Sequence, residues 1–197
     1  MSRLNVVPIV EGHGEQKSAI RTLVRRVWEL VGGEYVNVLR PIREPRSKLM
    51  KRDGLRKAIE LADIKLRELR SDDRSLILVL FDADEDLPCM LAPQLAAIVR
   101  DECGHLDVAI VLPNPEFETW FAAAAESLTR YFDLAVTPPS ADPEVSGQRK
   151  GAVRRWMHGQ YSETIDQVRL TEAMDLNLCR SRSPSFDKLC RELAKRL

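Results

Sequence analysis

Several features that mark specialised classes of protein are missing from this 197-residue sequence. It contains no run of about 18 apolar residues and no apolar signal core at the N-terminus. We therefore expect no membrane span and no secretory leader, and a cytoplasmic location. A Walker motif is also absent, so any ATPase activity would have to come from a separate protein.

The cysteines, the aromatic residues and the net charge do not indicate any particular binding partner. The four cysteines are scattered without a CxxC pair, which predicts reduced thiols rather than a zinc knuckle or a disulfide framework. Aromatic residues make up 6% of the chain, so a base-stacking surface for single strands is not indicated. Thirty basic and thirty acidic residues cancel, but residues 40–57 hold eight basic residues. This basic cluster is either a surface for a nucleic-acid backbone or a solvated loop.

The stretch Leu76–Asp86 (LILVLFDADED) leads from six apolar residues into a segment with four acids. Such an unbroken apolar run predicts a strand buried on both faces of a parallel sheet. Asp82 and Asp84 would then lie at the carboxyl edge of the sheet, where open α/β folds bind ligands. Two carboxylates about 4 Å apart repel by roughly 4 kcal/mol at an effective dielectric of about 20, which favours a bound cation. Oxygen ligands favour Mg²⁺, Mn²⁺ or Ca²⁺; a solvated acidic turn is the alternative.

Strand and helix patterns alternate along the first part of the chain. Apolar runs predict strands near residues 4–10, 35–39, 76–81 and 107–112. Pro8 counts against a strand inside the sheet because it cannot donate to the ladder. Helical spacing predicts helices over residues 15–31, 53–69 and 93–103, with a loop over residues 40–52. The fold class is therefore α/β, a Rossmann-like parallel sheet of about four strands flanked by helices.

The pattern changes after Leu112. Residues 116–128 are expected to form a helix in which Trp120 is a core side chain, and residues 133–150 form a long loop rich in proline, serine and glycine. Further helices are predicted near residues 151–158 and 164–175, and a last helix begins at Ser183-Pro184. We expect residues 1–130 to form the α/β core, with residues 131–197 as a helical C-terminal extension packed on it in one domain.

The turn after the first strand, Glu11-Gly12-His13-Gly14-Glu15, carries two acids and two glycines. Because adjacent parallel strands end at the same edge, Glu11 is expected to share a pocket with the Asp82 turn. Gly12 and Gly14 let the backbone approach a phosphate or a metal-bound water. The Rossmann fingerprint is incomplete, because Lys17 stands in place of its third glycine, so dinucleotide binding is not expected.

A glutamate after the first strand and a D-x-D after a later strand resemble the toprim signature of topoisomerases, primases and OLD-type nucleases. The longer matches are VEGHGE (residues 10–15), PEFETWF (115–121) and CRSRSPSFDKLCREL (179–193). Together they resemble the toprim-related family called domain of unknown function 4276, over nearly the whole chain. The resemblance implies a toprim-like fold and a Mg²⁺- or Mn²⁺-dependent nuclease that acts on nucleic-acid phosphodiesters. It also implies a separate ATPase partner in phage defence or DNA repair.

The resemblance implies roles for the acids at matching positions. Glu11 is implied as a metal ligand or general acid/base, and Glu15 as the second acid of the same turn. Asp82 and Asp84 match the D-x-D metal ligands. Three further acids remain candidate metal ligands: Asp86, Glu116 and Glu118. Residues two apart on a helix diverge by about 200°, so only one of the last two is expected to face the pocket.

Metal-assisted phosphoryl transfer also needs positive side chains opposite the metal. Arg149, Lys150, Arg180 and Arg182 are candidates, and Lys150 and Arg182 are the expected catalytic pair, whereas Glu85 is expected to face water. Two alternatives stay open: a non-catalytic metal- or nucleotide-binding regulatory subunit, and a glycosyltransferase that uses D-x-D to hold a metal-bound diphosphate. The choice between DNA and RNA and the oligomeric state are not predicted.

Overall fold

The computed structural model describes residues 4–11, 19–69, 73–147 and 149–197. Its strands are β1 (Leu4–Val10), β2 (Val36–Val38), β3 (Ile42–Arg43), β4 (Arg74–Leu80) and β5 (Val108–Val111). Its α-helices are α1 (Ile20–Leu30), α2 (Arg46–Leu49), α3 (Arg52–Glu68), α4 (Pro88–Cys103), α5 (Glu118–Ala123), α6 (Lys150–Trp156), α7 (Glu163–Ala173), α8 (Leu176–Arg182) and α9 (Pro184–Ala194). A 3-10 helix, η2 (Ala125–Leu128), follows α5.

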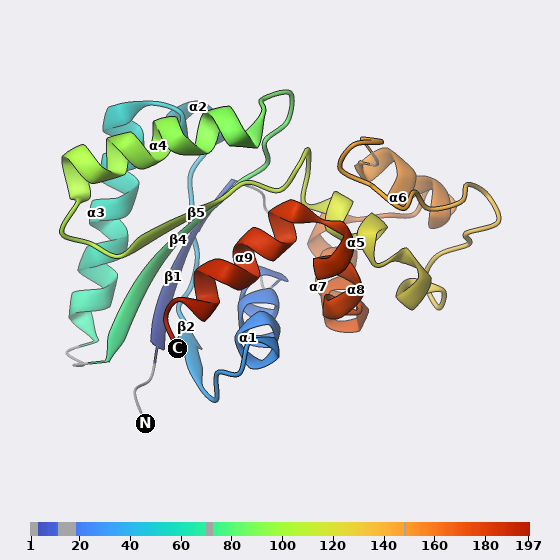
Figure 1. Cartoon of the computed structure of the whole chain (residues 1–197), viewed down its shortest axis with the longest axis horizontal. Helices are drawn as coiled ribbons and strands as arrows, with labels where there is room; N and C mark the ends of the chain where they lie inside the picture. Colours follow the sequence, from blue (N-terminus) through green and yellow to red (C-terminus); the bar gives the residue numbers. More distant parts are fainter. Residues whose placement is uncertain (1–3, 12–18, 70–72, 148) are drawn as a thin grey trace.

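The strands form one parallel sheet in the order β2-β1-β4-β5, and β3 pairs with β1 beyond the end of β2. Helices α3 and α4 cover one face, and α1 and α9 cover the other (Figure 1). The predicted α/β class with a parallel sheet is therefore confirmed, with five strands instead of about four. The sheet lies between two helical layers, which is why β1 and the second half of β4 are buried without alternation.

Pro8 lies inside the central strand, at a position where its missing N–H costs no sheet hydrogen bond. The carbonyls of Val6 and Val10 accept hydrogen bonds from Leu39 and Glu44, at 2.9 and 3.0 Å, on the β2–β3 side of the strand. Backbone groups two residues apart point the same way. Pro8 therefore faces the break where β2 has ended and β3 has not begun, so the strand tolerates it.

Several predicted boundaries were wrong. The predicted loop over residues 40–52 contains β3 and α2, which are too short to show a period. Helix α4 begins at Pro88, with Pro93 inside it rather than at its start. The predicted helix over residues 116–128 is divided into α5 and η2, and α8 is a separate helix that the pattern did not reveal.

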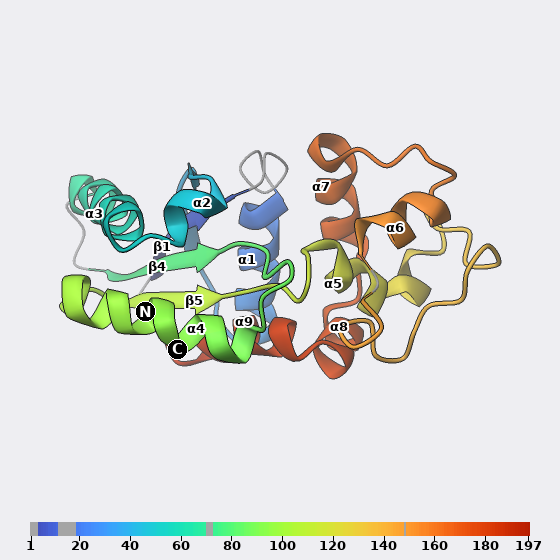
Figure 2. The same ribbon diagram turned by 90° about the horizontal axis from the view of Figure 1, so that it is seen from above.

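Helices α5 to α8 pack together beside the sheet (Figure 2). Trp120 on α5 is fully buried, with its ring 5.1 Å from Phe117 and 5.3 Å from Phe186. Its N–H donates to the hydroxyl of Ser185 at 2.8 Å. The interpretation of Trp120 as a core side chain is confirmed, and Ser183 caps α9 as predicted by accepting the N–H of Phe186. The described residues include no helix long and apolar enough to cross a bilayer.

The end of α9 is held to the sheet by a buried carboxylate. Glu192, 6% exposed, accepts hydrogen bonds from Lys188, Lys195 and Arg196, and Arg196 also pairs with Asp107 ahead of β5. Burial raises the pKa of Glu192, but the three hydrogen bonds outweigh it and lower the pKa to about 2. Charged Glu192 therefore stabilises the fold at neutral pH.

Glu192→Gln is expected to lower the free energy of unfolding by about 3 kcal/mol at pH 7, because the folded protein holds the pKa of this carboxyl group at about 2. Because the folded pKa is depressed, this contribution is present above the unfolded pKa of about 4.5 and disappears as the pH falls through about 2. Urea unfolding at pH 7, 4 and 2.5 measures it. Glu34→Gln, an exposed site, serves as the control. A deficit that is the same at all three pH values would contradict the ionic origin.

Candidate functional site

The register of the two central strands brings the first predicted acids to one edge of the sheet. Strands β1 and β4 are paired residue by residue from Leu4↔Arg74 to Val10↔Leu80. Glu11 follows directly after β1, and the Asp82 turn follows directly after β4. We use the name carboxylate edge for four of the acids that follow these strands: Glu11, Asp82, Asp84 and Asp86.

Glu11 and Asp84 interact electrostatically. Glu11 is half-buried, and this burial raises the pKa of its carboxyl group above the usual value. A hydrogen bond from the backbone of Arg46 lowers that pKa, while the negative charge of Asp84 raises it further. Arg43 donates to the main-chain carbonyl of Glu11 at 3.0 Å. Glu11 and Asp84, which follow two different strands, thus lie close enough for their negative charges to repel each other.

The turn that carries Asp82 and Asp84 is fixed by the segment after β5. The N–H of Ala83 donates to the carbonyl of Pro113, and the N–H of Asp84 donates to that of Pro115, both at 2.9 Å. Asp82 accepts the N–H of Phe117 through Oδ1 at 2.8 Å. Asp84 has φ +54°, a left-handed conformation that is uncommon for a residue other than glycine. Such conformations cluster at functional sites, where the surrounding structure holds them.

Arg46 is the cation of the carboxylate edge. Its Nε lies 3.2 Å from Asp84 Oδ2, and its Nη2 pairs with Asp86. The same guanidinium donates to the carbonyl of Ala83 at 3.1 Å. Sequence reasoning placed Arg46 in the basic cluster without separating it from its neighbours. Its position at the start of α2, directly after β3, brings it to the same sheet edge as the acids.

A second group of charged residues, at the start of α6, lies near the carboxylate edge. Arg149 pairs with Glu85 at 2.8 Å, and this hydrogen bond raises the pKa of its guanidinium against the effect of burial. The charges of Glu85, Glu116 and Asp84 raise it further. Glu85 was expected only to face water; its exposed carboxylate has Arg149 as a partner. Arg149 therefore lies where the prediction put a positive side chain, near the D-x-D acids.

Lys150 lies among glutamates. Its backbone N–H donates to Glu116 Oε2 at 2.9 Å, and its ammonium pairs with Glu163. Burial lowers the pKa of Lys150, but the bond to Glu163 and the charges of Glu118, Glu163 and Glu116 raise it overall. Lys150 is thus a charged side chain that joins α6 to α5 and α7.

Glu116 and Glu118 have different surroundings. Glu116 precedes α5, which begins at Glu118, so the two residues are not two positions on one helix. Glu118 is 2% exposed, and it accepts hydrogen bonds from Tyr161 at 2.6 Å and Gln167 at 3.2 Å. Burial raises the pKa of Glu118 despite these bonds. The charge of Glu116 acts on Arg149, which pairs with Glu85 of the turn that carries Asp84.

The arginines before the last helix have partners of their own. Arg182, the other expected catalytic cation, binds both carboxylate oxygens of Glu126 at 2.7 Å and the carbonyl of Ala123 at 3.4 Å. Arg180 pairs with Asp187 at 2.8 Å. The structure thus ties Arg182 to α5 and η2, whereas Arg46 and Arg149 pair with residues of the Asp82–Asp86 turn.

Part of the predicted site falls on residues 12–18. Gly12, His13, Gly14 and Glu15, together with the predicted helix start near Glu15, lie outside the described residues. Within the described ranges, no group of three or more histidine, cysteine, aspartate or glutamate side chains is arranged to hold a metal ion. Among the described acids, Glu11 and Asp84 interact electrostatically, and Asp82 stands two residues before Asp84.

Comparison with known proteins identifies the family. The sequence profile of the family described as "Domain of unknown function (DUF4276)" matches residues 10–194. The chain belongs to this family. Searches of curated proteins and of solved structures found no match. In this DUF4276 chain the matched range begins at the last residue of β1 and ends at the last residue of α9, so it takes in both acidic turns and α5.

Proposed function

We propose that this DUF4276 chain is a divalent-metal-dependent nuclease-like enzyme that acts on nucleic-acid phosphodiesters. The supporting observation is that Glu11, after β1, interacts with Asp84, which follows the neighbouring strand β4 in the same turn as Asp82. The proposal includes Mg²⁺ or Mn²⁺ as cofactor, a cytoplasmic location, and a separate ATPase partner, in line with the toprim resemblance.

The side chains of the carboxylate edge fit a hard divalent cation by their chemistry. All are carboxylates, the ligand type that Mg²⁺ and Mn²⁺ prefer. Burial and the charge of Asp84 both disfavour the charged form of Glu11, a cost that a cation offsets. When bound, such a cation would polarise a phosphodiester oxygen and lower the pKa of a bound water. Arg46 offsets part of the negative charge through Asp84 Oδ2, so a cation would compete with it for this oxygen.

The arginines around the edge supply the phosphate contacts of the proposed reaction. The Arg46 side chain is 21% exposed and the Arg149 side chain 38%, so both reach solvent from positions beside the acids. An arginine guanidinium binds two phosphate oxygens at once and stays charged at any working pH. Arg46 and Arg149 approach from α2 and from the start of α6, on either side of the Asp82–Asp86 turn, so together they can orient one phosphodiester over the acids.

The ion pairs of Arg46 favour a second candidate function, a non-catalytic regulatory subunit that binds metal or nucleotide. A guanidinium that holds Asp84 and Asp86 gives the acids a structural partner without any metal. Binding of a metal or nucleic acid without cleavage would support this candidate over the enzyme.

The two candidates are separated by one set of assays on the whole chain. Labelled DNA and RNA are incubated with wild type in Mg²⁺, Mn²⁺ or EDTA, and the same reactions are run with Asp84→Asn and with the control Asp101→Asn. Asp101 lies near the end of α4, where it pairs with Arg52 at 3.1 Å. The enzyme is expected to cleave only with metal, and Asp84→Asn is expected to abolish cleavage. No cleavage of any substrate by wild type would overturn the enzyme proposal.

Metal binding is expected to show as thermal stabilisation. A ligand at 100 times its dissociation constant adds about 2.7 kcal/mol, which for a chain of this size raises Tm by roughly 5–10 °C. Wild type should gain this in Mn²⁺ or Mg²⁺, and Asp84→Asn should not. An equal rise in both proteins would place the metal elsewhere.

A further inference from the structure

Helix α6 carries its charged side chains on one face. Ala152, Val153 and Trp156 are buried, and the ring N–H of Trp156 donates to the carbonyl of Thr137 at 2.6 Å. The other face is exposed, and we call it the α6 face: Lys150, Gly151, Arg154 and Arg155. Because residues three and four apart are neighbours on a helix, these four positions adjoin one another.

The two arginines of the α6 face are not neutralised. Among the residues that the structure describes, no carboxylate pairs with Arg154 or Arg155. Lys150 differs from them, since its ammonium pairs with Glu163. From Arg149 to Ser162 the sequence contains four basic residues and no acid. The α6 face therefore presents positive charge to solvent.

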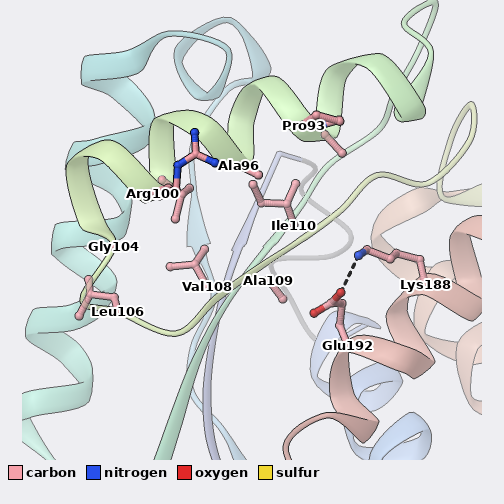
Figure 3. A pocket seen from close by; sticks show the side chains of 12 residues that line it. Pro93, Ala96, Arg100, Gly104, Leu106, Val108, Ala109, Ile110, Lys188 and Glu192 are labelled. Atoms are coloured by element: carbon pink, nitrogen blue, oxygen red, sulfur yellow. Dashed lines mark hydrogen bonds and ion pairs between the residues drawn. The ribbon is translucent and has the colours of Figure 1, made fainter.

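The basic cluster of residues 40–57 is largely neutralised, in contrast to the α6 face. Five of its eight basic residues pair with carboxylates of the chain: Arg46, Lys48, Arg52, Arg56 and Lys57. In the hollow of about 480 Å³ beside β5, the ammonium of Lys188 is likewise bound, to Glu192 at 2.5 Å (Figure 3). Such cations must give up an acid before they can bind a phosphate, whereas Arg154 and Arg155 need not.

The α6 face begins next to the carboxylate edge. Arg149, the residue before α6, pairs at 2.8 Å with Glu85 of the turn that carries Asp84. Helix α6 lies on the side of the molecule toward which β4 and β5 point (Figure 2). The guanidinium of Arg155 lies back along the helix, with Nη1 3.7 Å from the position that a Cβ on Gly151 would take. The cations thus form a line that starts at the Asp84 turn.

Gly151 keeps the α6 face open between its cations. A glycine inside a helix costs roughly 0.5–1 kcal/mol relative to alanine. Packing does not require it here, because a Cβ at this position would meet only Arg155 within 4 Å. The missing side chain instead lets the backbone of a ligand approach the helix between Lys150 and Arg154.

We propose that the α6 face binds the sugar-phosphate backbone of the nucleic acid whose phosphodiester lies at the carboxylate edge. The inference rests on the proposed function for the identity of this substrate. The six steps from Arg149 to Arg155 span about 9 Å of helix. Phosphates of one DNA strand follow each other about every 3.4 Å along the duplex axis, so the line of cations can contact two or three of them. Such contacts read no base and give binding without sequence preference.

Binding of labelled DNA and RNA oligonucleotides in EDTA, measured by fluorescence anisotropy at about 50–200 mM salt, tests the proposal. The double substitution Arg154→Gln/Arg155→Gln is expected to weaken binding at least about tenfold and to reduce the slope of log K against log salt by about 1.4–1.8. Gly151→Glu keeps every cation but adds a negative charge to the face, so it should also weaken binding. The control, Lys48→Gln/Lys57→Gln, removes two charges from exposed positions of the basic cluster and should bind like wild type.

The use of EDTA separates this test from the metal-dependent cleavage of the proposed function. Unchanged binding by the folded arginine variant would overturn the role of the α6 face and leave the proposed function standing. An equal loss in the control would also overturn it, because net charge alone would then set the affinity.

A wild type that binds no oligonucleotide would overturn the inference as well and leave the face for an acidic protein, while the cleavage assay in Mn²⁺ decides the proposed function separately. Circular dichroism establishes that each variant is folded; if the arginine variant is not, Gly151→Glu decides.

Discussion

Asp82→Asn is expected to reduce metal-dependent cleavage at least about 100-fold while the fold is retained. Asparagine keeps an oxygen that can accept the Phe117 N–H, which Asp82 Oδ1 binds at 2.8 Å. The substitution therefore removes the charge at the carboxylate edge without removing the acceptor that fixes the turn. Cleavage rates with excess Mg²⁺ or Mn²⁺, set against the wild type, measure the effect.

Asp82→Ala is the matched variant that separates the two roles of this side chain. It removes both the charge and the acceptor, so it should lose activity to the same extent and also lose about 1–2 kcal/mol of stability. Full activity in Asp82→Asn would show that the charge of Asp82 has no part in the reaction. Equal stability of the two variants would show that the bond to Phe117 contributes little.

Trp120→Ala is expected to have the largest effect on stability, about 3–5 kcal/mol. The side chain is fully buried between Phe117 and Phe186, and truncation leaves a cavity where α5, α8 and α9 meet. It also leaves Ser185 without the donor that binds it at 2.8 Å. For a chain of this size the loss corresponds to a fall in Tm of roughly 10 °C or more, measured by circular dichroism.

Trp120→Phe divides this loss into its two parts. Phenylalanine keeps most of the ring packing and lacks the N–H, so a loss of about 1–2 kcal/mol is expected. A phenylalanine variant as unstable as the alanine variant would mean that the hydrogen bond to Ser185, rather than the packing, holds this region together.

The elements of the fold that could be predicted are those in which one continuous stretch of sequence carries a long apolar pattern. The buried runs of β1 and β4 show no alternation because both faces of the sheet are covered, and α3 and α9 show clear apolar stripes. Strand β3 has two residues and is recognisable only by its pairing with β1. Helix α8 follows closely after α7; its one local signal is Asp175, which caps it by accepting two backbone N–H groups.

The same limit applies to the candidate site. The meeting of Glu11 with the Asp82 turn could be predicted because parallel neighbours share an edge. The partnership of Arg46 with Asp84 and Asp86 could not, because it depends on β3 and α2. The surroundings of Glu118 were also beyond prediction, since Tyr161 and Gln167 come from positions 43 and 49 residues further along the chain.

The position of α9 has a consequence for synthesis on the ribosome. This helix covers the face of the sheet that includes Leu78 and Ala109, yet it is the last element of the described chain (Figure 1). About 70 residues separate β5 from α9, and at roughly 5–20 residues per second they take about 4–14 s to translate. During that interval the nascent sheet carries an apolar face that lacks one of its two covering helices, because α1 is present and α9 is not. A chaperone that binds emerging chains therefore has this surface to protect until α9 is synthesised and covers it.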